Sequence, residues 1–163
     1  MTMEFRDLVK SLDEDLSRGA VDIDKYFRET ENAVRKASLS HLVSGLNEVF
    51  KQRLGALPNI ELNALHLALL AGALFRAACE SEEPDRSFAV LLGYSYATLA
   101  GGKPLDAAVF LLASIAAAHG RGDVATGLLK KIGIELERVV NFACGAVELA
   151  KFFETVDPVA LDW

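Results

Sequence analysis

Three consecutive segments, 64–79, 88–100 and 105–118, are almost entirely apolar, and they constrain the fold more than any other feature of the sequence. A membrane-spanning helix needs about 20 consecutive apolar residues. The first segment offers only the stretch between Asn63 and Arg76, and the other two are shorter than a span requires. A short helix that is apolar on all sides is typical of the centre of a helical bundle. We therefore expect three buried helices and no membrane span.

The composition favours helices throughout the chain. The sequence contains 24 alanines and only four prolines, and alanine has the highest helix propensity while proline has the lowest. We expect an all-α fold, a single-domain bundle of about six helices over residues 1–163. Two long helices, 22–54 and 122–155, would flank the short apolar core. We further expect an amphipathic helix within 1–20 and a C-terminal tail over 156–163.

The predicted helix 22–54 changes its apolar face midway along its length. The change coincides with the polar residues Ser38, Ser40 and His41. Because one straight helix face packs against one set of neighbours, we expect a kink or a change of packing partner there.

The last predicted helix, 122–155, carries a regular apolar seam. Eight residues follow alternating spacings of three and four: Leu129, Ile132, Leu136, Val139, Ala143, Ala146, Ala150 and Phe153. Such a seam is typical of a helix that packs lengthwise against another helix. Apolar residues off the seam give this helix a second apolar side, so we expect one side to pack on its own domain. The other side predicts a homodimer, or the docking of another helical protein.

Charge and cysteine usage narrow the choice of partners and location. The net charge is −6, and only the segment 33–58 is net positive. Binding to nucleic acid is therefore disfavoured, since its affinity comes mainly from Lys and Arg.

Cys79 and Cys144 form no CxxC motif and lie in apolar stretches, so we expect two free thiols that behave as small apolar side chains. The N-terminus lacks the apolar segment of a signal peptide, which predicts a cytoplasmic protein, and the single glutamine, Gln52, fits a thermophilic source.

Arg35 and His41 are candidate catalytic residues, six positions apart within the predicted helix 22–54. This Arg-x(4–6)-His spacing resembles the motif of the helical HEPN nucleases, whose Arg and His meet at a dimer interface and cleave RNA. Lys36 departs from the family pattern, which usually has a polar, uncharged residue after the Arg. The resemblance implies a dimeric ribonuclease in which Arg35 and His41 act together.

Other catalytic or cofactor motifs are missing from the sequence. No histidine follows a carboxylate by three positions, as a metal site inside a helical bundle would require. The phosphate-loop pattern is also incomplete, because Ala97 and Pro104 stand where Gly and Ser or Thr are needed. We expect no metal and no cofactor. The sequence favours a non-enzymatic interaction or scaffold module, with the HEPN-like ribonuclease as the alternative and a small-molecule-binding bundle as a third hypothesis.

Overall fold

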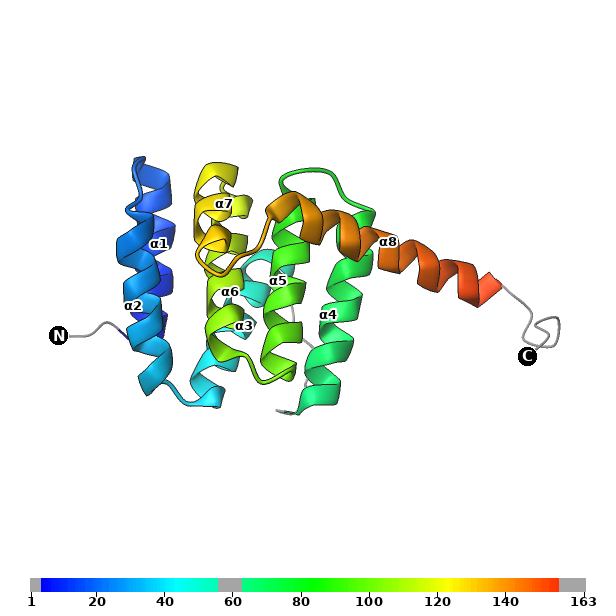
Figure 1. Ribbon diagram of the computed structural model, residues 1–163, viewed down its shortest axis with the longest axis horizontal. Coiled ribbons are helices and arrows are strands. Elements are labelled where there is room, and N and C mark those ends of the chain that lie inside the picture. Colours follow the sequence, from blue (N-terminus) through cyan, green and yellow to red (C-terminus); the bar gives the residue numbers. More distant parts are fainter. Residues whose placement is uncertain (1–3, 56–62, 156–163) are drawn as a thin grey trace.

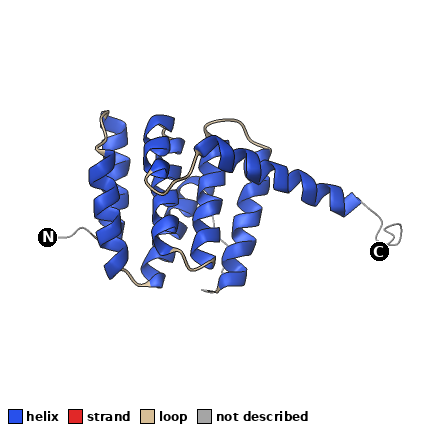
Figure 2. Cartoon of the chain, in the orientation of Figure 1, coloured by secondary structure: helices blue, strands red, loops and turns tan. Residues whose placement is uncertain are grey.

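The computed structural model describes residues 4–55 and 63–155, and these residues form eight helices and no strand. Figure 2 shows the helices joined by loops. The helices are α1 Phe5–Arg18, α2 Ile23–Lys36, α3 Leu39–Leu54, α4 Ala64–Cys79, α5 Asp85–Ala100, α6 Pro104–Ala118, α7 Gly122–Lys130 and α8 Leu136–Thr155. The all-helical bundle expected from the sequence is confirmed, although the number of helices is eight rather than six. The expected tail, 156–163, lies outside the described residues. Among those residues, no helix is both long enough and apolar enough to cross a lipid bilayer.

The core of the bundle surrounds α6, which stands between its neighbours in Figure 1. Every residue of α6 from Ala107 to Ala117 is buried, and the helix contacts α1, α2, α3, α5 and α7. Hydroxyls inside this core are satisfied by nearby backbone. Ser95 donates to the carbonyl of Ala107 and Ser114 to that of Leu111, both at 2.6 Å. The core is therefore apolar without leaving these polar groups unpaired.

The helix α4 lies at the edge of the bundle, which corrects the expectation that its apolar segment is buried on all sides. In Figure 1 it is the outermost upright helix on the right, beside α5 and crossed by α8. Leu67, Leu70 and Leu74 are buried, whereas Leu65 and Leu69 are 67% and 62% exposed. An almost wholly apolar helix therefore presents one apolar face outward.

The predicted helix 22–54 is two helices, α2 and α3, so its length is corrected. Ala37 has an extended backbone that ends α2, and the Ser38 side chain then caps α3 by accepting a hydrogen bond from the His41 backbone N–H. A serine at this position satisfies a free N–H of the first helical turn. The break coincides with the polar run at which the sequence predicted a change of packing.

The predicted helix 122–155 is also two helices, α7 and α8, which corrects the expectation of one long C-terminal helix. Gly133 has φ +73°, a left-handed conformation that favours glycine. Its N–H donates to the Lys130 carbonyl, and the N–H of Ile134 donates to the Leu129 carbonyl. These two bonds form a Schellman motif, which ends a helix and redirects the chain. As a result α7 packs beside α6, and α8 runs across the bundle (Figure 1).

Candidate interaction surface

The helix α8 crosses the bundle at the ends of α4 and α5 and continues beyond α4, as Figure 1 shows. Ala143 and Val147 on its inner side are 2% and 7% exposed. Leu136, Val139 and Val140 are half-buried and pack against the core. The first half of α8 thus belongs to the bundle, and its second half projects past the edge formed by α4.

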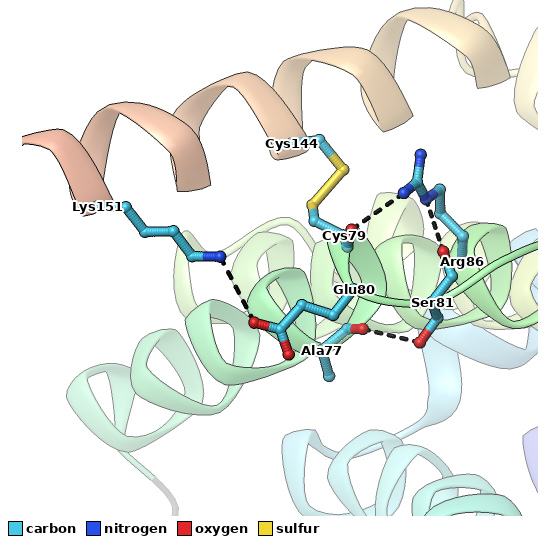
Figure 3. The surroundings of a disulfide bond; sticks show 7 residues. All are labelled: Ala77, Cys79, Glu80, Ser81, Arg86, Cys144 and Lys151. Carbon is cyan, nitrogen blue, oxygen red and sulfur yellow. Dashed lines mark hydrogen bonds and ion pairs between the residues drawn. A yellow bond between two sulfur atoms is a disulfide. The ribbon is translucent and has the colours of Figure 1, made fainter.

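A disulfide between Cys79 and Cys144 joins the last residue of α4 to the middle of α8 (Figure 3). The two Cα atoms are 5.5 Å apart, a separation typical of disulfides. This pairing corrects the expectation of two free thiols. The sequence offers no signal for it, because the cysteines are 65 positions apart and meet only through the turn at Gly133 that sends α8 across α4.

Polar contacts surround the disulfide, some between α8 and α4 and some within the bundle at the end of α4. Lys151 Nζ lies 3.5 Å from Glu80 Oε1, and Arg76 pairs with Glu154. Near the end of α4, Arg86 donates to the carbonyls of Cys79 and Ser81 at 3.0 Å each (Figure 3). The charged side chains of α8 at positions 151 and 154 are therefore turned toward its own bundle.

The outer side of α8 is apolar and exposed. Phe142, Leu149 and Phe153 are 73%, 57% and 56% exposed, and Ala146 between them is also exposed. Their spacings of four, three and four place these four residues, the outer stripe, on one helix face. Phe152 is exposed beside the outer stripe and its ring contacts that of Phe153. No charged residue stands within the stripe.

A second exposed apolar face lies on α4. It contains two leucines and three small residues, which we call the α4 edge face: Leu65, Ala68, Leu69, Gly72 and Ala73. Nothing lies within 4 Å of the position that a Cβ on Gly72 would occupy. Because the second half of α8 projects past α4 (Figure 1), the outer stripe and the α4 edge face occur at the same end of the molecule.

The eight residues of the predicted seam do not share one helix face. Leu129 is buried in α7, Ile132 lies in the turn before Gly133, and Leu136, Val139 and Ala143 face the core. The last three seam residues, Ala146, Ala150 and Phe153, are exposed on α8. Phe142 was expected on the second apolar side of this helix rather than on the seam, and Leu149 was placed on neither side; both are exposed beside Ala146 and Phe153.

Arg35 and His41, the candidate catalytic pair, lie on different helices. Arg35 is exposed in the last turn of α2, and His41 is exposed in the first turn of α3. The His41 ring nitrogen Nδ1 is 2.9 Å from the Ser38 hydroxyl, which ties the ring to the start of its own helix. The HEPN resemblance was drawn on the expectation that both residues lie in one helix, 22–54. The structure corrects that expectation, because Arg35 is in α2 and His41 is in α3.

A groove of about 560 Å³ runs between the start of α5, α7 and α8. Its polar lining includes Glu83, Ser87 and Lys130, and Ser87 donates to Glu83 at 2.7 Å. The lining includes the hydroxyls of Ser87 and Thr126 but contains no His or Cys. In the part of the chain that the structure describes, no three His, Cys, Asp or Glu side chains gather as metal ligands.

Comparisons with family models, with curated proteins and with solved structures find no match to this chain. The features of the described surface that bear on function are the outer stripe and the α4 edge face.

Proposed function

We propose that this chain is a non-enzymatic interaction module that self-associates through its C-terminal helix, α8. The observation that carries the proposal is the outer stripe, in which Phe142, Leu149 and Phe153 are more than half exposed on one face. Contiguous exposed apolar surface is typical of sites that bind another protein. Charged groups of α8 pair on its opposite side, so the stripe suits an apolar partner surface.

A second copy of the chain fits this surface better than an unrelated helix does. A phenylalanine buries roughly 150–250 Å² when it is covered, so Phe142, Phe152 and Phe153, at 73%, 59% and 56% exposed, offer roughly 400 Å². A stable interface buries about 800 Å² on each partner. The three rings alone are therefore too small an area, and the α4 edge face at the same end of the molecule supplies further apolar area.

Two-fold symmetry lets both faces be covered at once. If α8 of each copy lies along α4 of the other, the outer stripe of one meets the α4 edge face of its partner, and the same contact occurs twice. The faces differ in a complementary way, since the stripe carries large rings while the α4 edge face includes Ala68, Gly72 and Ala73. Large side chains pack well into a helix surface of small ones.

The disulfide bears on where such a module would work. Disulfides are rare in the reducing cytoplasm of most organisms, but they are common in intracellular proteins of hyperthermophiles. We therefore propose a cytoplasmic protein of a thermophilic source, in which the Cys79–Cys144 bond can form inside the cell.

The test replaces single residues of the outer stripe by glutamate. Leu149→Glu and Ala146→Glu each place a charge inside the proposed interface, so we expect monomers that keep the helical circular-dichroism spectrum of the unchanged protein. Both side chains are exposed, so neither substitution removes core packing. Mass is measured by light scattering at matched protein concentrations.

Leu39→Glu is the matched control, because Leu39 is 49% exposed at the start of α3, outside both proposed faces. This variant should associate as the unchanged protein does. A Leu149→Glu protein that still forms dimers would contradict the proposal, as would a Leu39→Glu protein that loses them. A stable complex with a different helical protein, formed by a monomeric chain, would also contradict it.

A further inference from the structure

The contacts that attach α8 to the bundle change in character near Cys144. Ala143 and Val147 are buried on either side of this cysteine, whereas every residue from Glu148 to Glu154 is exposed. The ion pairs to Glu80 and Arg76 join exposed side chains, and such pairs contribute little to stability. The disulfide is therefore a covalent link between α8 and the end of α4, three residues before Val147, the last described residue of α8 that is buried.

We infer that the Cys79–Cys144 disulfide is a redox-sensitive tether that controls self-association through the outer stripe. This inference rests on the proposed function. In the oxidised protein the tether holds α8 across α4, which fixes the outer stripe relative to the α4 edge face. A surface that is already fixed loses less conformational entropy on binding than a mobile one. The oxidised protein therefore associates tightly and the reduced protein weakly.

The position of the disulfide allows this chemistry. Both cysteines are half-buried, so a small dithiol reductant has access to them. Its thiolate attacks one sulfur, the S–S bond breaks, and a mixed disulfide forms. The second thiol of the reductant then displaces the remaining cysteine. Two electrons and two protons pass to the protein, Cys79 and Cys144 become thiols, and the reductant becomes a cyclic disulfide.

Reduction should release α8 and leave the end of α4 in place. Arg86 of α5 donates two hydrogen bonds to the chain at the end of α4, one to the Cys79 carbonyl and one to the Ser81 carbonyl (Figure 3). These bonds satisfy carbonyls at a helix terminus and do not involve the sulfur atoms. The element that gains freedom is therefore the projecting half of α8.

The test compares the oxidised and reduced full-length chain by two measurements. Sedimentation velocity over a concentration series gives the dissociation constant of the dimer, which we expect to rise at least about tenfold when dithiothreitol reduces the protein. Hydrogen exchange of amides 145–154 reports the release of α8, and it should accelerate by about tenfold or more while exchange in α6 stays unchanged. A double variant, Cys79→Ser with Cys144→Ser, should match the reduced protein with and without dithiothreitol.

The outcomes distinguish a failure of the redox-sensitive tether from a failure of self-association. Dimers of equal or greater stability after reduction would overturn the tether and leave the proposed function standing. Unchanged exchange of amides 145–154 would overturn it as well, and so would a response of the double variant to dithiothreitol. If the oxidised protein is a monomer at every concentration, the proposed function and the inference both fail. The comparison of oxidised with reduced protein decides the matter even if the double variant does not fold.

Discussion

Gly93 determines how closely α4 and α5 approach each other. A Cβ at this position would stand 2.7 Å from Phe75 Cε1 and 3.3 Å from the Ala71 carbonyl oxygen. The Phe75 ring is itself in contact with Tyr94, at 5.0 Å between ring centroids, so it has little room to move. We expect Gly93→Ala to lower the free energy of unfolding by about 1–3 kcal/mol, the usual range for overpacking. Urea denaturation measures this change.

Gly72→Ala is the matched control for that substitution. Gly72 lies within α4, and nothing stands within 4 Å of its Cβ position. Alanine is the better helix former by about 1 kcal/mol, so this variant should be more stable than the unchanged protein at low concentration. If the two substitutions change stability in the same direction, close approach at Gly93 is not what decides the effect.

Tyr26 connects α2 to α1 through its hydroxyl, which lies 2.9 Å from Ser11 Oγ and donates to Asp15 at 2.5 Å. Burial, together with the hydrogen bond to Asp15, raises the pKa of Tyr26 to about 12. Because the folded-state pKa lies above the ordinary value near 10, this group stabilises the fold fully below pH 10. That contribution is lost as the pH rises through about 12.

Tyr26→Phe tests this assignment. At pH 7 we expect a loss of about 2 kcal/mol in the free energy of unfolding, the usual contribution of a hydrogen bond to a charged group. Between pH 10 and about 12 the unchanged protein should lose more stability than the variant. Urea denaturation at a series of pH values compares them. If the free energy of unfolding changes with pH in the same way for both proteins, the Tyr26 hydroxyl does not titrate as assigned.

At the scale of the elements, the helices predicted best are those whose sequences are apolar on all sides. The segments 88–100 and 105–118 correspond to α5 and α6, which are buried. The segment 64–79 has the same composition, yet α4 lies at an edge. Apolar content alone does not reveal how many neighbours a helix has, because that number depends on the path of the whole chain.

The predicted long helices are broken at Ser38 and at Gly133, and only the first of these breaks was indicated by the sequence. Ser38 is a favoured N-cap residue, and the change of apolar face pointed to it. The break at Gly133 was missed because the three-and-four spacing from Leu129 to Phe153 continues through it. Glycine at the end of a helix was the available signal, and a regular heptad pattern outweighed it.

The disulfide yields a prediction at the same scale. Cys144→Ser removes a cross-link over 65 positions, and closing a loop of that length stabilises a protein by about 4 kcal/mol through the unfolded state. We expect a loss of this size in urea denaturation without reductant. With reductant present the variant and the unchanged protein should have the same stability. A loss below about 1 kcal/mol would mean that the bond does not form in most molecules.

At the scale of the whole molecule, the two faces of the proposed interaction surface could be predicted from the sequence only in part. Ala146, Ala150 and Phe153 of the predicted seam are exposed on α8, whereas Leu129 and Ala143 are buried in their own bundle. Regular spacing predicts a continuous seam only if the residues lie on one straight helix. The turn at Gly133 divides the predicted seam between α7 and α8. The α4 edge face had no sequence signal at all, since it becomes an outer surface only when α4 takes its place at the edge.

The measurement that tests self-association most directly is the mass of the oxidised, unchanged protein in solution over a wide range of concentrations. One chain has a mass of 17.6 kDa. We expect light scattering to give a mass that rises with concentration to that of two chains and then stays constant, because a two-fold interface closes on itself. A mass of 17.6 kDa at every concentration would contradict self-association through α8.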